Sequence, residues 1–396
     1  DWLVLDLTDG SGVAVGIATA LQFIPFLIIT PFAGVMADRF SRRTLMIWAH
    51  IGLVSISIVL LVALLTNTAN VAVVFVLAAL TGSMAAIDFP SRQALVGQLV
   101  GNEHLTNAVA LNSVAFNLAR ISGPAIAGVL IAGTGLPVVI GVIVAFFAIA
   151  LTAIASLRRI PKTRKGDLPR ATFSDGLKFL RSRPELMFLL ALVFFVALFG
   201  LNFQLTTALM ATQEFAGGAA SFGILSTFLA LGSLVGSLLA ARRTQVRVRL
   251  IVVSALAFGS ATLLAGVMPK WALFALVLPL CGITAMTFTT AAQSFLQLAT
   301  PDHLRGRVMG IYTMLFFAGT PIGAPLIGWL SDILGARVGL IGGGIGVVAS
   351  TALLSWQLLR RREMRVTGHL HSPHLQLHRR VGALPPAEAD LPLSHL

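Results

Sequence analysis

Several polar side chains stand alone in long apolar stretches, where protein or cavity water must satisfy their hydrogen bonds. Arg120 lies about fifteen residues into such a stretch, roughly 22 Å along it by helical rise. Asn112, Asn117 and Gly123 flank it at intervals of about three and eight residues, which places much of this set near one helical face. The chemistry is charge compensation and ligand binding in a polar cavity. The alternative is a structural arginine that caps carbonyls of a helix broken at Pro124.

Ionisable residues within apolar segments could carry a proton, because their pKa can cross the working pH when the surroundings change from wet to dry. Asp1, about ten residues from the first polar turn, is the leading candidate for a carrier. Asp6 and Asp88 lie nearer the ends of their segments, and all three acids could instead be interfacial or fixed ion-pair residues. His50 is a weaker candidate.

Further polar residues in apolar stretches are expected to line a central cavity: Gln22, Asn202, Gln204, Gln293 and Tyr312. The 25 phenylalanines suit a large apolar or planar ligand, although Phe is also ordinary lipid-facing filler. The sequence carries no nucleophile with its base, no Walker loop, no dinucleotide fingerprint and no paired metal ligands. We therefore expect no catalytic residue, cofactor or metal site, and no enzyme activity.

Long apolar runs must position these residues. The chain is 57% hydrophobic and 11% charged, with a mean hydropathy of +0.91, which contradicts a soluble protein. Residues 1–8 are too few to span a bilayer and are read as the end of a truncated first helix. An all-α polytopic membrane protein of twelve spans is predicted, the other eleven covering residues 13–36, 44–65, 71–96, 105–133, 137–157, 186–211, 218–241, 250–268, 271–298, 308–334 and 338–359.

The net charge of +13 follows this topology. Of the 28 Lys and Arg residues, only Lys270 and Arg337 fall in outer loops and Arg120 falls within a helix, so the other 25 lie on the inner side. This is the positive-inside distribution and not a nucleic-acid footprint. Both termini are expected in the cytoplasm, and the single cysteine, Cys281, excludes a disulfide within the chain.

The stretch from Gly34 to Arg43 joins the second and third spans and is predicted to be a tight polar turn. Glycine permits close helix approach, the aspartate can cap a helix or pair with a base, and the arginines can bind anionic lipid. A basic hairpin with no moving part is the alternative. The pattern resembles the signature loop of the major facilitator superfamily, apart from Ser41 in place of an inner glycine; its matching residues are Gly34, Asp38, Arg39, Arg42 and Arg43.

Similar segments recur about 200 residues apart. The glycines of Gly123-Pro124-Ala-Ile-Ala-Gly128 recur in Gly323-Ala-Pro-Leu-Ile-Gly328, and residues 88–99 align with 287–298. Chance similarity in a Gly- and Ala-rich membrane protein is the alternative. Parallel six-helix repeats are typical of the superfamily, with a substrate site between the halves at the bilayer midplane.

Four regions follow from this repeat. Residues 1–157 form an N-terminal six-helix bundle with a truncated first helix, and residues 185–359 form the C-terminal bundle. Between them, residues 158–184 form a cytoplasmic linker with an amphipathic helix, since Phe173, Leu177 and Leu180 have helical spacing. Residues 360–396 are a basic tail rich in His and Pro, expected to be disordered and solvated; its histidines could alternatively hold a metal.

The segment from Asn112 to Gly128 looks like the fifth-helix motif of proton-linked exporters of this superfamily, with Ala119 and Ala127 replacing two glycines. The resemblance implies that this helix packs closely against the other half. Most of the chain is similar to enterobactin-exporter-like efflux proteins and their actinobacterial relatives, which implies export of small organic molecules driven by proton entry. The basic residue that many drug–proton antiporters carry midway along the fourth helix is missing here.

Asp88 and Arg92 are predicted to emerge beside the turn that follows the second span. Together with Asp38, Arg39 and Arg42 they are expected to form a charge network that closes the cytoplasmic gate. Surface ion pairs contribute only about 0–1 kcal/mol each, which suits contacts that break in every cycle.

The leading hypothesis is a proton-coupled exporter of drug-like or siderophore-like molecules that works by rocker-switch alternating access. Its partners would be a small-molecule substrate, protons and the lipid bilayer, without nucleic acid, in a monomer of a bacterial-type inner membrane. Uptake, lipid translocation and a non-transporting membrane sensor on the same scaffold are the alternatives.

Overall fold

The structure is a computed structural model that describes residues 2–157, 173–241 and 247–360. Within these ranges, side chains are described except at residues 30–39, 93–94, 96–118, 120–122, 124–125, 173, 241, 302–303 and 359–360. This part of the chain is helical and contains no strand. Ten of its helices are long and apolar enough to cross a bilayer. The predicted all-α polytopic membrane fold is therefore confirmed.

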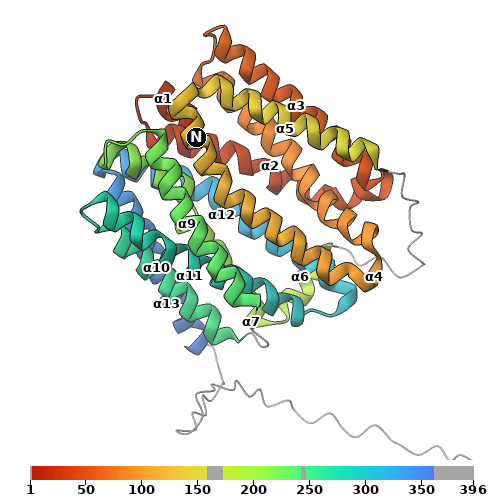
Figure 1. Ribbon diagram of the computed structural model, residues 1–396. Helices are drawn as coiled ribbons and strands as arrows, with labels where there is room; N and C mark the ends of the chain where they lie inside the picture. Colours follow the sequence, from red (N-terminus) through yellow and green to blue (C-terminus); the bar gives the residue numbers. More distant parts are fainter. Residues whose placement is uncertain (1, 158–172, 242–246, 361–396) are drawn as a thin grey trace, which may run out of the picture.

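The helices form two groups, drawn in red to yellow and in green to blue in Figure 1. The first group comprises α1 (Trp2–Leu7), α2 (Gly12–Arg39), α3 (Arg42–Leu65), α4 (Val71–Thr134) and α5 (Leu136–Ser156). The second comprises α6 (Phe173–Arg181), α7 (Pro184–Phe199), α8 (Phe203–Leu209), the π-helix η1 (Met210–Glu214), α9 (Ala219–Ala241), α10 (Val248–Gly266), α11 (Trp271–Leu298), α12 (Asp302–Leu334) and α13 (Ala336–Arg360).

Short capped turns join the helices. Ser41 accepts a hydrogen bond from the backbone N–H of Thr44 and so begins α3, and Asn70 caps α4 in the same way through Val73. Gly135 and Gly335 have φ of +83° and +94° at the ends of α4 and α12. Glycine adopts this conformation without a Cβ penalty, which explains the same turn at equivalent places in the two halves.

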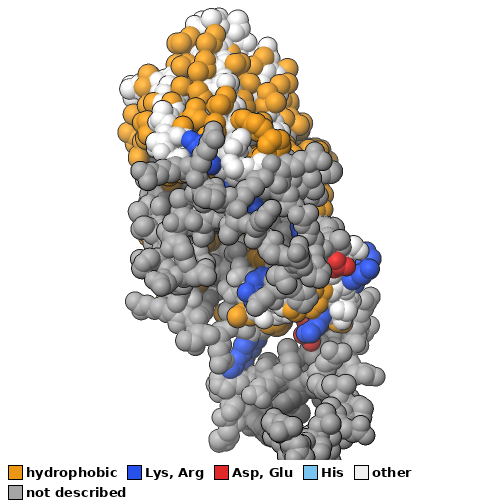
Figure 2. All heavy atoms as spheres, turned by 90° about the vertical axis from the view of Figure 1, so that its right-hand side faces the viewer, with side chains coloured by type: hydrophobic (Ala, Val, Ile, Leu, Met, Phe, Trp, Pro, Cys, Tyr) orange, Lys and Arg blue, Asp and Glu red, His pale blue; other side chains and the backbone are white. Residues whose placement is uncertain are grey.

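Basic residues gather at one end of the bundle, which we call the basic end. It includes the α2–α3 turn, the end of α5, the start of α7, the start of α10 and the start of α12. Figure 2 shows apolar side chains over the upper part of one face and the Lys and Arg side chains in view lower down. The α3–α4, α4–α5, α10–α11 and α12–α13 turns lie at the other end, which we call the opposite end.

The predicted polar turn from Gly34 to Arg43 is much shorter than expected. Helix α2 continues through Gly34 and Asp38 to Arg39, so only Phe40 and Ser41 separate it from α3. No residue before Phe40 breaks the helix, since one internal glycine costs a helix only about 1 kcal/mol. The prediction of a turn at Gly34, Asp38 and Arg39 was therefore wrong.

Helix α4 is continuous over 64 residues, where two helices separated by a turn near residues 97–104 were predicted. That stretch contains glycines but no proline, so nothing in it removes a backbone donor. Because α3 ends and α5 begins at the opposite end, α4 must leave that end and return to it. It therefore supplies both predicted crossings without the predicted non-helical turn.

The predicted span 186–211 is interrupted. Between α7 and α8 the chain leaves the helix at Gly200, where a Cβ would press on the Phe258 ring, and resumes after Asn202. Helix α6 lies in the linker region, its apolar face packs on α7 and α12, and its Leu180 is fully buried. This face is covered by protein and is not free to lie on lipid.

Candidate functional site

Helices α2 and α12 run antiparallel and form one contact between the two halves. Toward the opposite end, their backbones meet at glycines. A Cβ on Gly16 would lie 2.6 Å from the Ala324 carbonyl oxygen and 2.7 Å from the Pro325 Cα, and a Cβ on Gly328 would overlap the Gly12 carbonyl oxygen. Only glycine permits this approach, so the halves are closed at this end. We call this contact the α2–α12 seam.

Helices α4 and α9 form a second contact between the halves, the α4–α9 seam (Figure 1). A Cβ on Gly128 would lie 2.7 Å from the Ala219 carbonyl oxygen and 3.0 Å from the Gly223 Cα. Gly128 and Gly328 are repeat equivalents, and Ala219 and Gly223 each lie 207 residues after Gly12 and Gly16. The sequence repeat thus corresponds to two related seams.

The other repeated glycines differ between the halves. A Cβ on Gly323 would overlap the Leu198 carbonyl oxygen of α7, so this glycine packs within the second half. Its equivalent, Gly123, is exposed, and a Cβ there would meet no described atom within 4 Å. Pro124 lies in α4, and its side chain is outside the described residues.

A carboxylate crosses the α2–α12 seam at the opposite end. Asp332, near the end of α12, accepts hydrogen bonds from the backbone N–H groups of Gly12 at 2.6 Å and Val13 at 2.9 Å, and from the Ser11 hydroxyl at 3.1 Å. It therefore caps the N-terminus of α2 from the other half, where the helix dipole favours negative charge. Gln213 adds a second crossing, donating to the Gly10 carbonyl at 2.8 Å.

Aromatic rings fill the middle of the same seam. The ring centroid of Phe317 on α12 lies 4.5 Å from that of Phe26 and 5.6 Å from that of Phe23, both on α2. Phe89 of α4 meets Phe317 edge-on at 6.4 Å. Such ring pairs contribute about 0.5–1.5 kcal/mol each beyond the area that they bury. Phe317 is thus the point where the second half meets two helices of the first.

Asp88 is buried between α3 and α4, with 5% of its surface exposed. Its Oδ2 lies 3.0 Å from an Arg92 guanidinium nitrogen, and its Oδ1 lies 3.4 Å from His50 Nδ1. The predicted Asp88–Arg92 pair therefore forms, but it is not the surface pair that was expected. His50, considered only as an isolated proton carrier, joins it.

The other basic and acidic residues of the signature loop and the gate network make no described contact with Asp88. Arg43 donates from Nε to the Ile154 carbonyl at 3.2 Å and from a terminal nitrogen to the Ala155 carbonyl at 2.5 Å, where it satisfies the C-terminus of α5. Arg42 is half-buried at the start of α3. The side chains of Asp38 and Arg39 lie outside the described residues.

The predicted cavity residues separate into two kinds. Asn202 is buried at the α7–α8 break, donates to the Leu198 carbonyl at 2.9 Å and has an Oδ1 without a partner among the described residues. Tyr312 is buried beside Phe316, and its hydroxyl reaches the Thr289 carbonyl only at 3.5 Å. Gln204 and Gln293 are exposed, and Gln22 is half-buried with its backbone against Gly82.

Asn112, Asn117 and Arg120 lie in α4, but their side chains are outside the described residues, as is Asp1. Their predicted roles remain predictions. Among the described side chains, no group of three or more metal-binding residues occurs.

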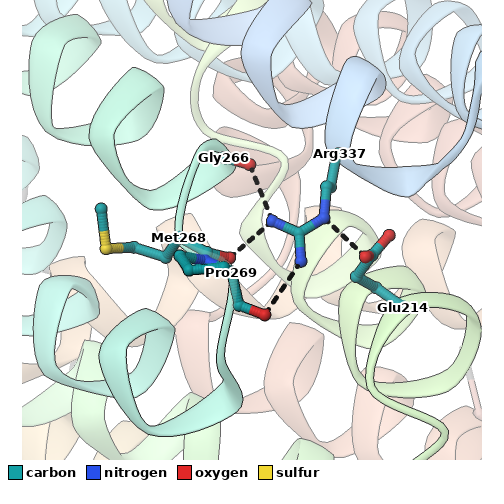
Figure 3. Close-up of polar contacts among 5 residues, drawn as sticks. All are labelled: Glu214, Gly266, Met268, Pro269 and Arg337. Atoms are coloured by element: carbon teal, nitrogen blue, oxygen red, sulfur yellow. Dashed lines mark hydrogen bonds and ion pairs between the residues drawn. The ribbon is translucent and has the colours of Figure 1, made fainter.

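Arg337 holds the opposite end of the second half together (Figure 3). It pairs with Glu214 at 2.5 Å and donates to the carbonyls of Met268 at 2.5 Å and of Gly266 and Pro269 at 3.4 Å. One side chain thereby ties α13 to the end of η1 and to the α10–α11 turn. This explains a basic residue on the side that is otherwise poor in them.

We expect Arg337→Ala to lower the free energy of unfolding by about 2 kcal/mol, because it leaves Glu214 and three carbonyls without their charged donor. The measurement is thermal unfolding in detergent. Lys270→Ala, which removes the other basic residue of this end from an exposed position, is the control and should unfold like the wild type. Equal melting of the two variants would contradict the assigned role.

Sequence reasoning missed Asp332, Gln213 and Phe317. The sequence did offer an indication for Asp332, because an acidic residue close to the end of an apolar run is unusual. Its partner at the start of α2 is 320 residues away, and no local pattern indicates that distance.

Two related helical halves, joined by glycine seams and surrounded by apolar helix faces, define a membrane transporter of the major facilitator type. The chain matches the family described as transmembrane secretion effectors over residues 1–384 and belongs to it. This is a family of transporters of small molecules and not of enzymes, and the protein is a multi-pass membrane protein.

Curated relatives agree with this membership. The chain is 26% identical over 369 residues to the enterobactin exporter EntS of Escherichia coli O1:K1, covering 90% of this chain and 85% of that protein. The enterobactin exporter EntS of Shigella flexneri matches at 26% over 368 residues with the same coverage.

Solved structures support the fold. A bacterial homologue of the human lysosomal transporter Spinster aligns with a TM-score of 0.73 at 14% identity, covering 91% of this chain and 93% of that one. The nucleoside transporter NupG aligns with a TM-score of 0.68 at 12% identity, covering 92% and 94%. At these identities the likeness concerns the fold alone.

Proposed function

We propose that this protein exports small organic molecules, drug-like or siderophore-like, by proton antiport through rocker-switch alternating access. The observation that carries the mechanism is the pair of related seams. In each, a helix of one half meets a helix of the other at glycines, so the halves can tilt about two similar contacts. The bundles within residues 1–157 and 185–359 would be the moving bodies, joined by the linker at 158–184.

The chemistry of the substrate follows from the relatives. Curated proteins that match over 90% of this chain are enterobactin exporters, so enterobactin is the first substrate to test. The buried Asn202 with its free oxygen and the rings around Phe317 would suit a partly polar, aromatic molecule. Arg120, Asn112 and Asn117 of α4 remain proposed cavity residues, and Arg120 would attract an anionic group.

The orientation follows from charge. Placing the basic end in the cytoplasm of a bacterial-type inner membrane obeys the positive-inside rule and puts the end of α13 on the inner side. The cap made by Asp332 then lies on the outer side. We expect the monomer to be the transporting unit.

The test is transport of iron-free enterobactin by the purified full chain in proteoliposomes. A proton gradient that drives protons in the direction opposite to the substrate should raise enterobactin accumulation severalfold above that in liposomes without protein. A protonophore should abolish this accumulation. Accumulation that ignores the gradient would count against antiport. Absence of enterobactin transport together with proton-driven movement of a planar dye such as ethidium would shift the substrate to the drug-like class.

A further inference from the structure

The buried pair of Asp88 and His50 differs from a fully satisfied ion pair in the hydrogen bonding of one carboxylate oxygen. Asp88 Oδ2 is held by Arg92, but Asp88 Oδ1 is buried and accepts no hydrogen bond from the described residues. A buried acceptor without a partner is costly, by about 1–3 kcal/mol. It marks a place where a proton could bind.

The hydrogen on His50 can be assigned from its neighbours. Nδ1 lies 3.0 Å from the Met46 carbonyl oxygen and 3.4 Å from Asp88 Oδ1. Both are acceptors when Asp88 is ionised, so Nδ1 carries a hydrogen. A further proton can then go to His50 Nε2 or to Asp88 Oδ1, and the two residues share it as a coupled pair.

In the part of the chain whose side chains are described, few charges lie near this pair. Arg92 is the charged side chain in contact with Asp88. Arg43, at the start of α3, is engaged by α5 carbonyls, and α5 has no ionisable residue between Leu136 and Ser156. On α2, the side chains of Asp38 and Arg39 lie outside the described residues. Because buried ion pairs are sensitive to the loss of one charge, a proton here changes the α3–α4 contact strongly.

The next residue links the pair to the other half. Successive residues on a helix point about 100° apart, so Asp88 faces α3 while Phe89 reaches Phe317 of α12. Phe317 in turn packs on Phe23 and Phe26 of α2. Phe89 therefore connects the turn of α4 that carries Asp88 to a ring in the α2–α12 seam.

We propose that His50 and Asp88 form the proton-binding site of this transporter, coupled to the seam through Phe89 and Phe317. With the pair deprotonated, Arg92 holds Asp88 and Phe89 stays against Phe317. Proton uptake neutralises Asp88, releases it from Arg92 and loosens the seam toward the basic end. This inference rests on the proposed antiport.

The test measures opening of the full chain directly. Spin labels at Ser156→Cys and Ser182→Cys, exposed positions at the basic ends of the two halves, are used in a Cys281→Ala background. Lowering the pH should shift the population toward the longer distance at least tenfold. In Asp88→Asn and in His50→Asn, which keeps a donor for Met46, the shift should fall below twofold. Asp9→Asn, an exposed acid in the first turn, should respond like the wild type.

Phe89→Ala separates binding from coupling. It should bind the same number of protons as the wild type, counted with a pH indicator in unbuffered protein, yet lose most of the distance response, whereas Asp88→Asn should lose the proton as well. An unchanged response in correctly folded Asp88→Asn and His50→Asn would overturn the site, while gradient-driven enterobactin transport by the wild type would leave antiport standing. A wild type with neither a pH response nor gradient-driven transport would overturn both.

Discussion

Alanine at Gly328 should abolish transport and hold the two halves apart at the opposite end. The added Cβ would overlap the Gly12 carbonyl oxygen and lie 3.0 Å from the Val13 backbone nitrogen. Both are backbone atoms at the start of a capped helix, so they cannot move aside as a side chain could. Overpacking of this kind costs about 1–3 kcal/mol or more, which shifts a two-state equilibrium by one to two orders of magnitude.

The measurement pairs transport with distance. Labels at Thr68→Cys and Lys270→Cys report separation of the halves at the opposite end, in a Cys281→Ala background, and both positions are exposed. Gly328→Ala should favour the longer distance and lose enterobactin accumulation. Gly123→Ala is the control, because it makes the same change on a repeat-related helix in a place where no described atom lies within 4 Å. A closed distance and normal transport in Gly328→Ala would show that the seam tolerates a methyl group.

Composition and the 200-residue repeat were enough to predict the fold class and to direct attention to the seams. A bilayer leaves few alternatives for long apolar runs, since their backbone groups must bond within helices. The repeat at Gly128 and Gly328 identified small residues on related helices before their partners were known. The repeat reflects close approach of two helix backbones, which requires glycine at the contact whatever residues surround it.

Helix ends and long-range polar contacts could not be predicted in the same way. The basic pattern from Gly34 to Arg43 suits a turn, yet nothing before Phe40 stops α2, so charge placement alone gave the wrong boundary. Asp88 and Arg92 were paired correctly because they are four residues apart on one helix. The third member of this cluster, His50, lies on α3. Its contact with Asp88 depends on how α3 and α4 are rotated relative to each other, which the sequence does not indicate.

The two seams are related by the repeat but differ in one charge. The residue equivalent to Asp332 in the first half is Ala132, so the α4–α9 seam has no carboxylate at this position to cap α9. The α2–α12 seam is therefore the more strongly fastened of the two at the opposite end. Because its cap must release whenever the halves separate there, Asp332 should set how often that side opens.

Replacing Asp332 with alanine should accordingly increase the open population at the opposite end about 5- to 30-fold, the effect of removing about 1–2 kcal/mol from the closed state. Three donors, the Ser11 hydroxyl and the N–H groups of Gly12 and Val13, lose their acceptor together. The open population of Asp332→Asn should fall between those of Asp332→Ala and the wild type, since asparagine keeps one acceptor oxygen but no charge for the helix dipole.

The Thr68–Lys270 label pair measures the open population, and Asp6→Ala, which removes an exposed acid on α1, is the control. Equal populations in Asp332→Ala and Asp6→Ala would mean that the glycine contacts alone hold this end closed, and that the cap forms as a consequence of closure without contributing to it.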